Sequence, residues 1–474
     1  MLKEVAKALW PFVVVSVAPA LAVAQIANFQ HVIVVIQENR SPDNLFQGLC
    51  VPPFGTSSSC SAKPSGPQYN ILTSNWLDKN SPTGFTQPLP IHLGIAYDLS
   101  HSHKAFVSMY DRGKMDGAGG VVCLGACPTT PQYKYVGNKQ HTLDPYLELA
   151  TQYGWANYMF QTNQGSSFPA HQFLFGGTSA PSTPDDAAGI FASENSTPVG
   201  ATAGCIALAT TSVELIDPTG EHQRIFPCFE HQTLADLLDN AGIAWKYYTP
   251  GVGLDWTAPN AIEHICQPSA PTGGKCTGPD FVNNVDLKPA DVLTDIGNCK
   301  LAAVSWVIPS GTNSDHAAKL VNIGGPAWVA SIVNAVGNNP VCPNGEVYWN
   351  NTAILVTWDD WGGWYDHEPP TVLPQPQGDY QYGFRVPFVF VSAYTPAAYV
   401  DNQRHDFGSV LRFIEHNFGI TEGALAFADA RAATDLTSFY NPNLLPRPFL
   451  TISAPKGAQY FINDTTPLTD PDDD

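Results

Sequence analysis

Two uninterrupted hydrophobic runs stand out in the pattern of the chain. Residues 31–36 read His-Val-Ile-Val-Val-Ile, and residues 352–357 read Thr-Ala-Ile-Leu-Val-Thr. Continuous runs rich in β-branched residues are typical of parallel strands that are buried on both faces. The pattern therefore predicts two central strands of one sheet.

Weaker strand-like and helix-like segments alternate along the rest of the chain. The strand-like segments are residues 156–160, 244–248, 302–308 and 386–391, and the helix-like segments are residues 143–153, 233–241, 328–336 and 409–418. Repeated alternation predicts an α/β fold, with a mostly parallel central sheet sandwiched by helices. We expect one catalytic domain over residues 25–474, with an inserted lobe at about 179–300, where Pro, Gly and Cys are frequent.

The first two dozen residues have the pattern of a secretory signal. Lys3 and Lys7 precede an uncharged run over residues 8–23, which ends in Ala-Val-Ala before Gln25. Pro11 and Pro19 interrupt this run, whereas a membrane span needs about 20 apolar residues. We expect cleavage after residue 24, no integral membrane span in the mature chain, and a secreted or periplasmic location.

Ten cysteines follow one another as near neighbours. An even count fits an oxidising compartment, where disulfides close short loops. A zinc site is the alternative, but the chain has no Cys-x-x-Cys pair and no His at finger spacing. We expect a disulfide-bearing protein with the sequential pairs 50–60, 123–127, 205–228, 266–276 and 299–342.

The chain is strongly acidic, with a formal net charge of −20. Residues 1–24 carry two Lys and one Glu, so the charge after their removal is −21. Such a field repels nucleic acid, which we exclude as a partner. An anionic substrate would need local positive charge, and a divalent metal ion is its simplest source.

Carboxylates follow both hydrophobic runs directly. Glu38 and Asn39 come after the first run, and Asp359 and Asp360 come after the second. Ligands of α/β sheets bind at the carboxyl ends of the strands, where hard oxygen donors are able to hold a divalent cation. Either pair alone is explained equally well as loop residues or helix caps, but two such strand ends favour a metal site.

A serine pair lies between a predicted strand and a helix-like segment. Residues 163–171 read Asn-Gln-Gly-Ser-Ser-Phe-Pro-Ala-His, which places Ser166 or Ser167 at a helix N-terminus. Backbone N–H groups and the helix dipole stabilise a phosphate there and activate a nucleophile. A plain N-cap serine is the alternative.

Histidines occur beside acidic residues at several places. His101, His316 and His367 each stand in such a polar cluster, as does His405. Asp and His together supply metal ligands, or a general acid for a leaving alcohol.

Several segments together have the pattern of a known family. They are residues 35–41, 113–117, 305–309 with 314–316, 357–367, and 383–387 leading to 409–415. They lie in the same order over almost the whole mature chain. Through these segments the chain resembles a family of bacterial phosphoesterases, which includes phosphatidylcholine-type phospholipases C and acid phosphatases and is related to the alkaline phosphatase superfamily. The resemblance implies an alkaline-phosphatase-like α/β fold and hydrolysis of phosphate esters.

The resemblance also implies roles for single residues. Ser167 matches the nucleophile, and Glu38, Asn39, Asp359 and Asp360 match the metal and phosphate positions. His101, His316 and His367 are the expected catalytic histidines, and Asn39, Lys114 and His171 are expected to bind substrate. Asp360 stands where the family commonly has Glu, and His171 stands where it often has Arg.

The sequence is compatible with several functions. The substrate is a phosphate monoester or a phospholipid, and the absence of further β domains after residue 461 favours a phosphatase of the acid phosphatase type. A sulfatase-like hydrolase and a non-catalytic secreted binding protein on the same fold are the alternatives.

Overall fold

The structure is a computed structural model that describes residues 28–318, 324–371 and 382–472. The predicted signal at residues 1–24 lies outside the described residues. No helix among the described residues has both the length and the apolar character that crossing a membrane requires.

An eight-stranded sheet forms the centre of the molecule, in the order β13-β12-β14-β1-β15-β16-β8-β17. Its strands are β1 (His31–Gln37), β8 (Gly154–Phe160), β12 (Trp245–Tyr248), β13 (Val285–Asp286), β14 (Val304–Val307), β15 (Thr352–Trp358), β16 (Phe388–Val391) and β17 (Tyr399–Asp406). Only β16 runs against its neighbours, β15 and β8. The predicted mostly parallel sheet is therefore confirmed.

The two hydrophobic runs lie side by side at the centre of this sheet. Strand β1 pairs in parallel with β15, from His31 opposite Thr352 to Gln37 opposite Trp358. Every residue of both strands is buried, which explains why neither run alternates between apolar and polar positions.

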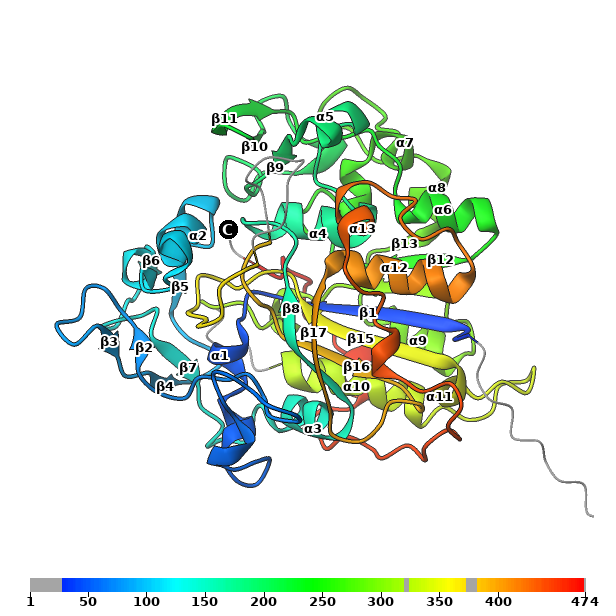
Figure 1. Ribbon diagram of the computed structural model, residues 1–474. Coiled ribbons are helices and arrows are strands. Elements are labelled where there is room, and N and C mark those ends of the chain that lie inside the picture. Colours follow the sequence, from blue (N-terminus) through cyan, green and yellow to red (C-terminus); the bar gives the residue numbers. More distant parts are fainter. Residues whose placement is uncertain (1–27, 319–323, 372–381, 473–474) are drawn as a thin grey trace, which may run out of the picture.

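Helices cover both faces of the sheet (Figure 1). One layer contains α4 (Ser167–Gly176), α6 (Leu234–Ala241), α12 (Phe407–Phe418) and α13 (Phe427–Arg431). The other contains α3 (Asp144–Gln152), α9 (Asp291–Gly297), α10 (Gly325–Gly337), α11 (Tyr348–Asn351) and α14 (Ala458–Ile462). The four predicted helices correspond to α3, α6, α10 and α12, so the predicted sandwich of helices is confirmed.

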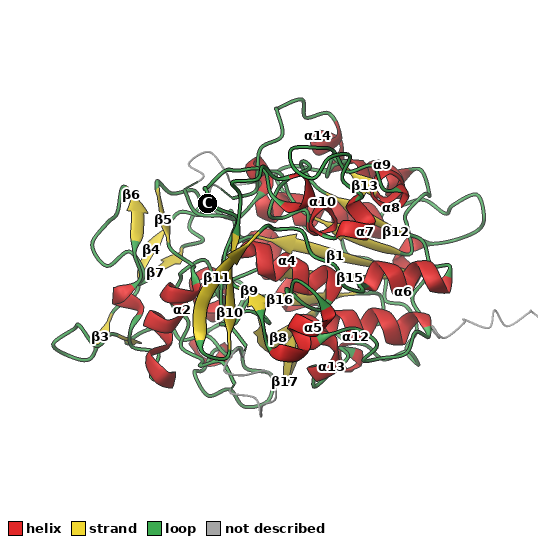
Figure 2. Cartoon of the chain, turned by 90° about the horizontal axis from the view of Figure 1, so that it is seen from above, coloured by secondary structure: helices red, strands yellow, loops and turns green. Residues whose placement is uncertain are grey.

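Smaller elements gather beyond the carboxyl end of β1, on the left of Figure 1. They include α1 (Pro42–Leu45), α2 (His103–Tyr110), β2 (Trp76–Leu77), β3 (Phe85–Thr86), β4 (Leu89–Ile91), β5 (Tyr97–Leu99), β6 (Cys123–Gly125) and β7 (Lys134–Val136). Figure 2 shows the same group from above, next to the sheet β9 (Phe191–Ala192), β10 (Val213–Asp217) and β11 (Gly220–Ile225). These elements surround the sheet edge at which ligands are expected.

The stretch 179–300 contributes to the central sheet as well as to the periphery. It contains α5 (Thr183–Ala188), α7 (Glu263–Cys266) and α8 (Pro279–Asn284) outside the sheet. It also supplies the strands β12 and β13 at one edge. The described part of this stretch is therefore continuous with the core.

The cysteines form the five sequential disulfides that we predicted. They join Cys50 to Cys60, Cys123 to Cys127, Cys205 to Cys228, Cys266 to Cys276, and Cys299 to Cys342. Four of the five close loops of fewer than 25 residues. These disulfides cross-link the Pro- and Gly-rich loops around the sheet.

Candidate active site

Two strand ends meet at the centre of the candidate site. Because β1 and β15 are parallel neighbours, Glu38 and Asn39 emerge beside Asp359 and Asp360. The backbone N–H of Asn39 donates to Asp359 Oδ1 at 3.1 Å, and the N–H of Asp360 donates to the same oxygen at 2.7 Å. All four side chains are fully buried. The predicted pairing of these two strand ends is therefore present.

Asn39 turns the chain sharply at the end of β1. Its φ of 60° lies in the left-handed region, which asparagine tolerates better than most residues. Gly362 packs against this turn so closely that an added Cβ would lie 2.4 Å from the Asn39 carbonyl oxygen. The turn aims the Asn39 side chain across the site, where its Nδ2 lies 3.3 Å from His101 Nε2.

Ser167 is the first residue of α4, and Ser166 is its N-cap. The preceding strand β8 runs parallel to β15, because both run against β16, so Ser167 reaches the same sheet edge. Its hydroxyl donates to Asp360 Oδ2 at 3.3 Å and lies at a similar distance from Asp472. A buried serine at a helix N-terminus, next to a carboxylate, has the surroundings of an activated nucleophile.

His171 lies one helical turn after Ser167, on the same face of α4. Its Nε2 is 3.6 Å from Glu38 Oε1 and 3.7 Å from Asp359 Oδ2. Burial lowers the pKa of His171 to about 4, so the ring is neutral and Nε2 can offer a lone pair. The structure thus places His171 among the carboxylates that we expected to hold a metal.

Several buried atoms of these side chains have a lone pair that could bind a metal ion and have no hydrogen-bond partner among the described residues. The atoms are Glu38 Oε1 and Oε2, Asn39 Oδ1, Asp359 Oδ2 and His171 Nε2. Burial raises the pKa of Asp359 to about 8, with a further contribution from Glu38, and burial raises the pKa of Glu38 well above its usual value. Unpaired, mutually repelling oxygen atoms beside a neutral imidazole fit the donor set of a divalent cation.

Asp360 is the better satisfied of the two aspartates. Its Oδ1 accepts the N–H of Gly362 at 2.6 Å, while Oδ2 accepts the hydroxyl of Ser167. Burial raises its pKa well above the usual value. The hydrogen bonds of Asp360 therefore orient the serine, whereas those of Asp359 hold Asn39 in place.

Two predicted catalytic histidines also lie at this site. His101 Nδ1 donates to the carbonyl of Leu99 at 3.1 Å, which leaves Nε2 to accept from Asn39. His316 Nδ1 donates to the carbonyl of Ala317 at 2.7 Å, so its Nε2 faces the interior of the site. The two rings lie 6.0 Å apart.

Asp472 is a member of the site that the sequence did not reveal. It is buried, and its Oδ1 lies 2.8 Å from His316 Nε2. Residues 470–474 read Asp-Pro-Asp-Asp-Asp, and no local pattern indicates that one of them enters the site. Asp472 is 305 positions from Ser167 along the chain.

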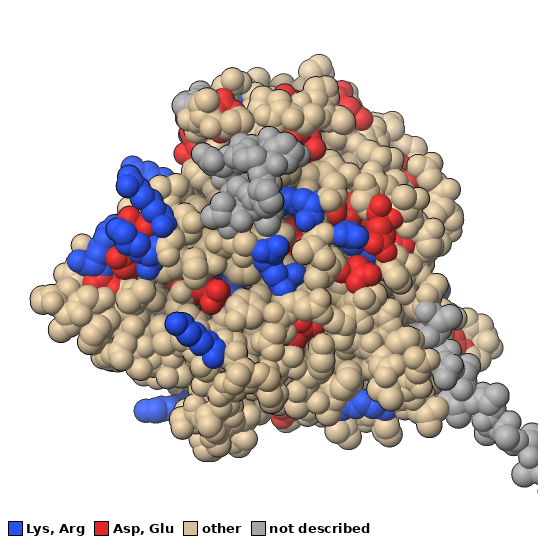
Figure 3. Space-filling view, viewed as in Figure 1, with Lys and Arg blue, Asp and Glu red and all other residues tan. Residues whose placement is uncertain are grey.

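Lys114 is not brought into this cluster. It lies in a turn after α2, where its ammonium group is 3.6 Å from Asp111 and its side chain is 64% exposed. Figure 3 shows Lys and Arg gathered near α2, on a face where most of the surface is neither basic nor acidic. The exposure of Lys114 and its pairing with Asp111 do not support the predicted contact with substrate.

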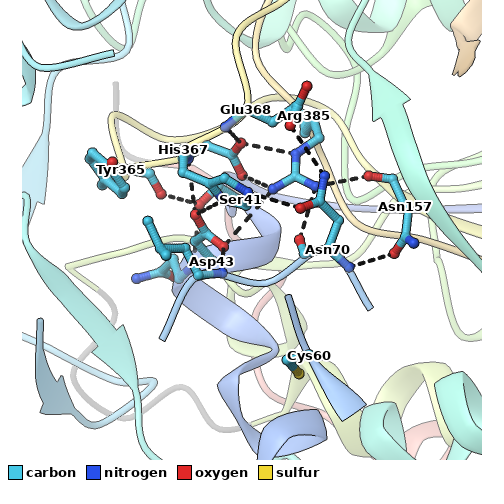
Figure 4. Close-up of polar contacts among 12 residues, drawn as sticks. Ser41, Asp43, Cys60, Asn70, Asn157, Tyr365, His367, Glu368 and Arg385 are labelled. Carbon is cyan, nitrogen blue, oxygen red and sulfur yellow. Dashed lines mark hydrogen bonds and ion pairs between the residues drawn. The ribbon is translucent and has the colours of Figure 1, made fainter. Parts of the chain in front are cut away.

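His367 lies in a different polar network (Figure 4). Its Nδ1 donates to Asp43 at 2.6 Å, and its Nε2 donates to Asn70 Oδ1 at 2.8 Å. Burial lowers the pKa of His367, but the charge of Asp43 outweighs it, so the pKa is raised. With both ring nitrogens bonded, His367 is placed to stabilise the fold and not to face Ser167.

The same network holds a buried ion pair. Arg385 binds Asp366 through two parallel hydrogen bonds of 2.9 Å, and its remaining donors reach the carbonyls of Asn70 and Asn157 (Figure 4). Asp43, Asp366 and His367 together have the geometry of a metal site. Because Arg385 and His367 already neutralise the two carboxylates, this cluster is a structural network.

The chain matches the sequence profile of a known protein family. The sequence profile of the phosphoesterase family matches residues 29–421. The chain belongs to this phosphoesterase family. The match includes the strand ends at Glu38 and Asp359 and the helix start at Ser167.

Curated relatives of this family member are phospholipases C. Phospholipase C B of Mycobacterium tuberculosis is 27% identical over 250 residues, which cover 46% of this chain and 45% of that protein. Non-hemolytic phospholipase C of Pseudomonas aeruginosa is 27% identical over 277 residues, or 49% of this chain and 38% of that protein. The chain thus spans less than half the length of these relatives.

Solved structures show a more distant likeness. A protein of the alkaline phosphatase superfamily from Vibrio parahaemolyticus is 14% identical, with 70% of this chain and 66% of that chain covered and a TM-score of 0.31.

Proposed function

We propose that this member of the phosphoesterase family hydrolyses phosphate esters with Ser167 as nucleophile and a bound divalent cation. The observation that carries the proposal is the hydrogen bond from Ser167 to Asp360, at a helix N-terminus beside unpartnered Glu38, Asp359 and His171. Nucleophile, base and cation ligands then meet around one point, as acyl or phosphoryl transfer requires.

The cation would be held by Glu38, Asn39, Asp359 and His171, with Asp360 as a further ligand through its remaining lone pairs. When bound, it would supply the positive charge that this acidic site lacks, lower the pKa of the serine hydroxyl and stabilise charge on the phosphate oxygens. We expected His171 to contact substrate, but its Nε2 lies toward Glu38 and Asp359, so we reassign it as a cation ligand.

In the first step, Ser167 Oγ attacks phosphorus and its proton passes to Asp360 Oδ2. The phosphorus–oxygen bond to the alcohol breaks, and the departing oxygen takes a proton from Nε2 of the charged His316 ring. Asn39 and His101 lie beside the same point and contact the non-bridging oxygens. Water then attacks the phosphoserine and gives a proton to His316 Nε2, while the bond to Ser167 Oγ breaks and Oγ takes back the proton from Asp360. A phosphate monoester is released from a diester substrate, and inorganic phosphate from a monoester.

A hollow of about 410 Å³ adjoins the loop that carries the nucleophile. It is lined by Gln164 and His103 together with the apolar side chains of Phe106, Val107, Tyr110 and Ile216. An apolar wall beside this loop would fit the apolar part of a large alcohol group. This hollow, with relatives named as phospholipases C, favours a lipid phosphodiester, while a phosphate monoester is the second candidate.

Export of the protein is part of the proposal. Five disulfides persist in an oxidising compartment and are rare in the cytosol. The signal-like residues 1–24 are consistent with the same location.

The test compares p-nitrophenyl phosphorylcholine, p-nitrophenyl phosphate and p-nitrophenyl sulfate, each with and without a chelator. We expect turnover of the first, loss of it with chelator, and loss of about 10³-fold or more in Ser167→Ala. Ser166→Ala is the matched control, because Ser166 contacts Glu194 instead of Asp360. Turnover of the sulfate alone would indicate a sulfatase, and no turnover of any ester would indicate a binding protein.

A further inference from the structure

The last described segment of the chain enters the candidate active site. Helix α14 is anchored by Phe461, whose ring lies 5.2 Å from that of Trp328. Residues 462–469 are then exposed, whereas Pro471 and Asp472 are buried. An exposed connection thus leads to two buried residues, of which Asp472 lies in the site.

Asp472 contacts the groups that the proposed mechanism uses. Its Oδ1 lies 2.8 Å from His316 Nε2, and its Oδ2 lies 3.7 Å from His101 Nε2 and 3.4 Å from Ser167 Oγ. In the proposed function these atoms are the general acid, a phosphate contact and the nucleophile. A substrate phosphate would have to occupy the space that the carboxylate fills.

The charge of Asp472 is unusual at this place. It raises the pKa of the already buried Glu38, and it acts in the same direction on Asp360 and Asp255. A fourth carboxylate beside Glu38, Asp359 and Asp360 is unfavourable unless the site is built to receive an anion. Two carboxylate oxygens facing a serine and two histidines reproduce part of the contact pattern of a phosphate group.

We propose that residues 463–472 act as a tethered competitive inhibitor, with the Asp472 carboxylate in the subsite for the substrate phosphate. This inference rests on the proposed function, which assigns Ser167, His101 and His316. Asp472 and a phosphate ester exclude each other, so the segment must leave before substrate binds.

Most of the segment is accessible to solvent. The connection from residue 462 to 469 is exposed, and its backbone is tied to the body of the protein by the Gly311 N–H, which donates to the Thr469 carbonyl at 3.0 Å. A short tether keeps its end at millimolar effective concentration near the site. Inhibition by the tether is therefore reversible, and it raises KM without lowering kcat.

The test uses two variants of the metal-loaded protein: a chain that stops at Asn463, and Asp472→Asn in the full chain. We expect KM for the ester to fall about tenfold in both while kcat stays the same, as expected when a group at millimolar effective concentration no longer competes. Asp464→Asn is the matched control, because it removes the same charge from an exposed position of the same segment. A synthetic peptide of residues 464–472 should inhibit the shortened chain competitively, and the same peptide carrying Asp472→Asn should not.

A second readout does not depend on turnover. Calorimetric titration with inorganic phosphate should show about tenfold tighter binding to Asp472→Asn than to the unchanged chain or to Asp464→Asn, for the same reason. Unchanged phosphate affinity in Asp472→Asn, or an unchanged KM where turnover is measurable, would overturn the proposal. Absence of turnover in every form would contradict the proposed function, while the phosphate titration would still decide whether the segment competes.

Discussion

His171 Nε2 lies 3.6 Å from Glu38 Oε1, and neither atom has a hydrogen-bond partner among the described residues. A buried histidine next to a buried carboxylate normally bonds it directly or carries a charge. Here burial keeps the ring neutral, so the two atoms face each other as two donors of electron pairs. The proposed cation would bind between these two atoms and relieve the repulsion between their lone pairs.

The first prediction concerns this cation. His171→Ala should weaken binding of the cation by about tenfold or more, because a nitrogen ligand is lost. Elemental analysis after dialysis against defined free-metal concentrations measures this affinity without any assay of turnover. Tyr247→Phe is the control, since the Tyr247 hydroxyl lies 3.5 Å from His171 Nδ1 and should matter less. Equal metal content in His171→Ala and the unchanged protein would remove His171 from the ligand set.

The kind of cation follows from the same donor set. An imidazole nitrogen with three carboxylate or amide oxygens suits manganese, iron, cobalt or zinc better than calcium, which prefers oxygen alone. After removal of metal, we expect manganese or zinc to restore turnover at lower concentration than calcium. Calcium as the most effective ion would contradict a nitrogen ligand.

Substitutions of two histidines should distinguish the candidate active site from the network of Figure 4. His316→Gln should lower kcat by about 10²-fold or more, because a general acid is lost, while stability changes little. His367→Gln should lower the free energy of unfolding and leave kcat within about twofold, because His367 bonds Asp43 and Asn70. Steady-state kinetics and urea unfolding of both variants check this. A large loss of kcat in His367→Gln, with stability unchanged, would return His367 to the catalytic group.

Arg385 should be more important for stability than any residue of the candidate active site. Its two hydrogen bonds neutralise buried Asp366, so Arg385→Met would leave a buried charge without its partner. We expect a loss of about 3–5 kcal/mol in the free energy of unfolding, measured by urea denaturation. The double variant Arg385→Met with Asp366→Leu should recover part of this loss, because no unpaired charge remains.

His264 provides a pH-dependent contribution to stability. Its ring nitrogens lie 2.9 Å from Asp236 and 2.8 Å from Glu230, and its hydrogen bond to Asp236 is the main cause that raises its pKa to about 9. A raised pKa stabilises the fold below the unfolded pKa of about 6.5, and the contribution disappears as pH rises through about 9. The half-exposed ring limits the effect to about 1 kcal/mol.

The measurement compares unfolding of the unchanged protein and His264→Gln across this range. The difference in free energy of unfolding should be largest near pH 6 and should vanish near pH 10, which are about the limits set by the two pKa values. A difference that stays constant with pH would show that His264 acts through packing alone.

The sequence predicted the centre of the sheet because its strands are buried on both faces. The residues of β1 and β15 do not alternate between apolar and polar, so each run is readily recognised as a buried strand. The acidic residues that follow the two strands lie close together because the strands are parallel neighbours. The outer strand β17 reads Tyr-Val-Asp-Asn-Gln-Arg-His-Asp, and half-exposed polar residues at a sheet edge carry no such pattern. It was therefore not predicted.

The site was predictable only where a local pattern carried it. His171 is four residues after Ser167 in a helix, a spacing that places both on one face. Because the family often has Arg at this position, we expected His171 to bind substrate and not a cation. His367 stands next to an acidic residue in sequence, yet the loop after Asp360 carries it to Asp43 instead. Asp472 entered the site through tertiary packing alone, which no spacing along the chain reveals.

The candidate site is assembled from residues that are far apart along the chain. Asn39 and Asp359 are 320 positions apart, and Ser167 and Asp360 are 193 apart. No short segment of the chain carries the proposed nucleophile, base and cation ligands together, so a polypeptide that is still emerging from the ribosome would lack the means to cut an ester. The proposed activity would therefore arise only once the whole sheet has closed, which would spare the phosphate esters of the cell that makes the protein.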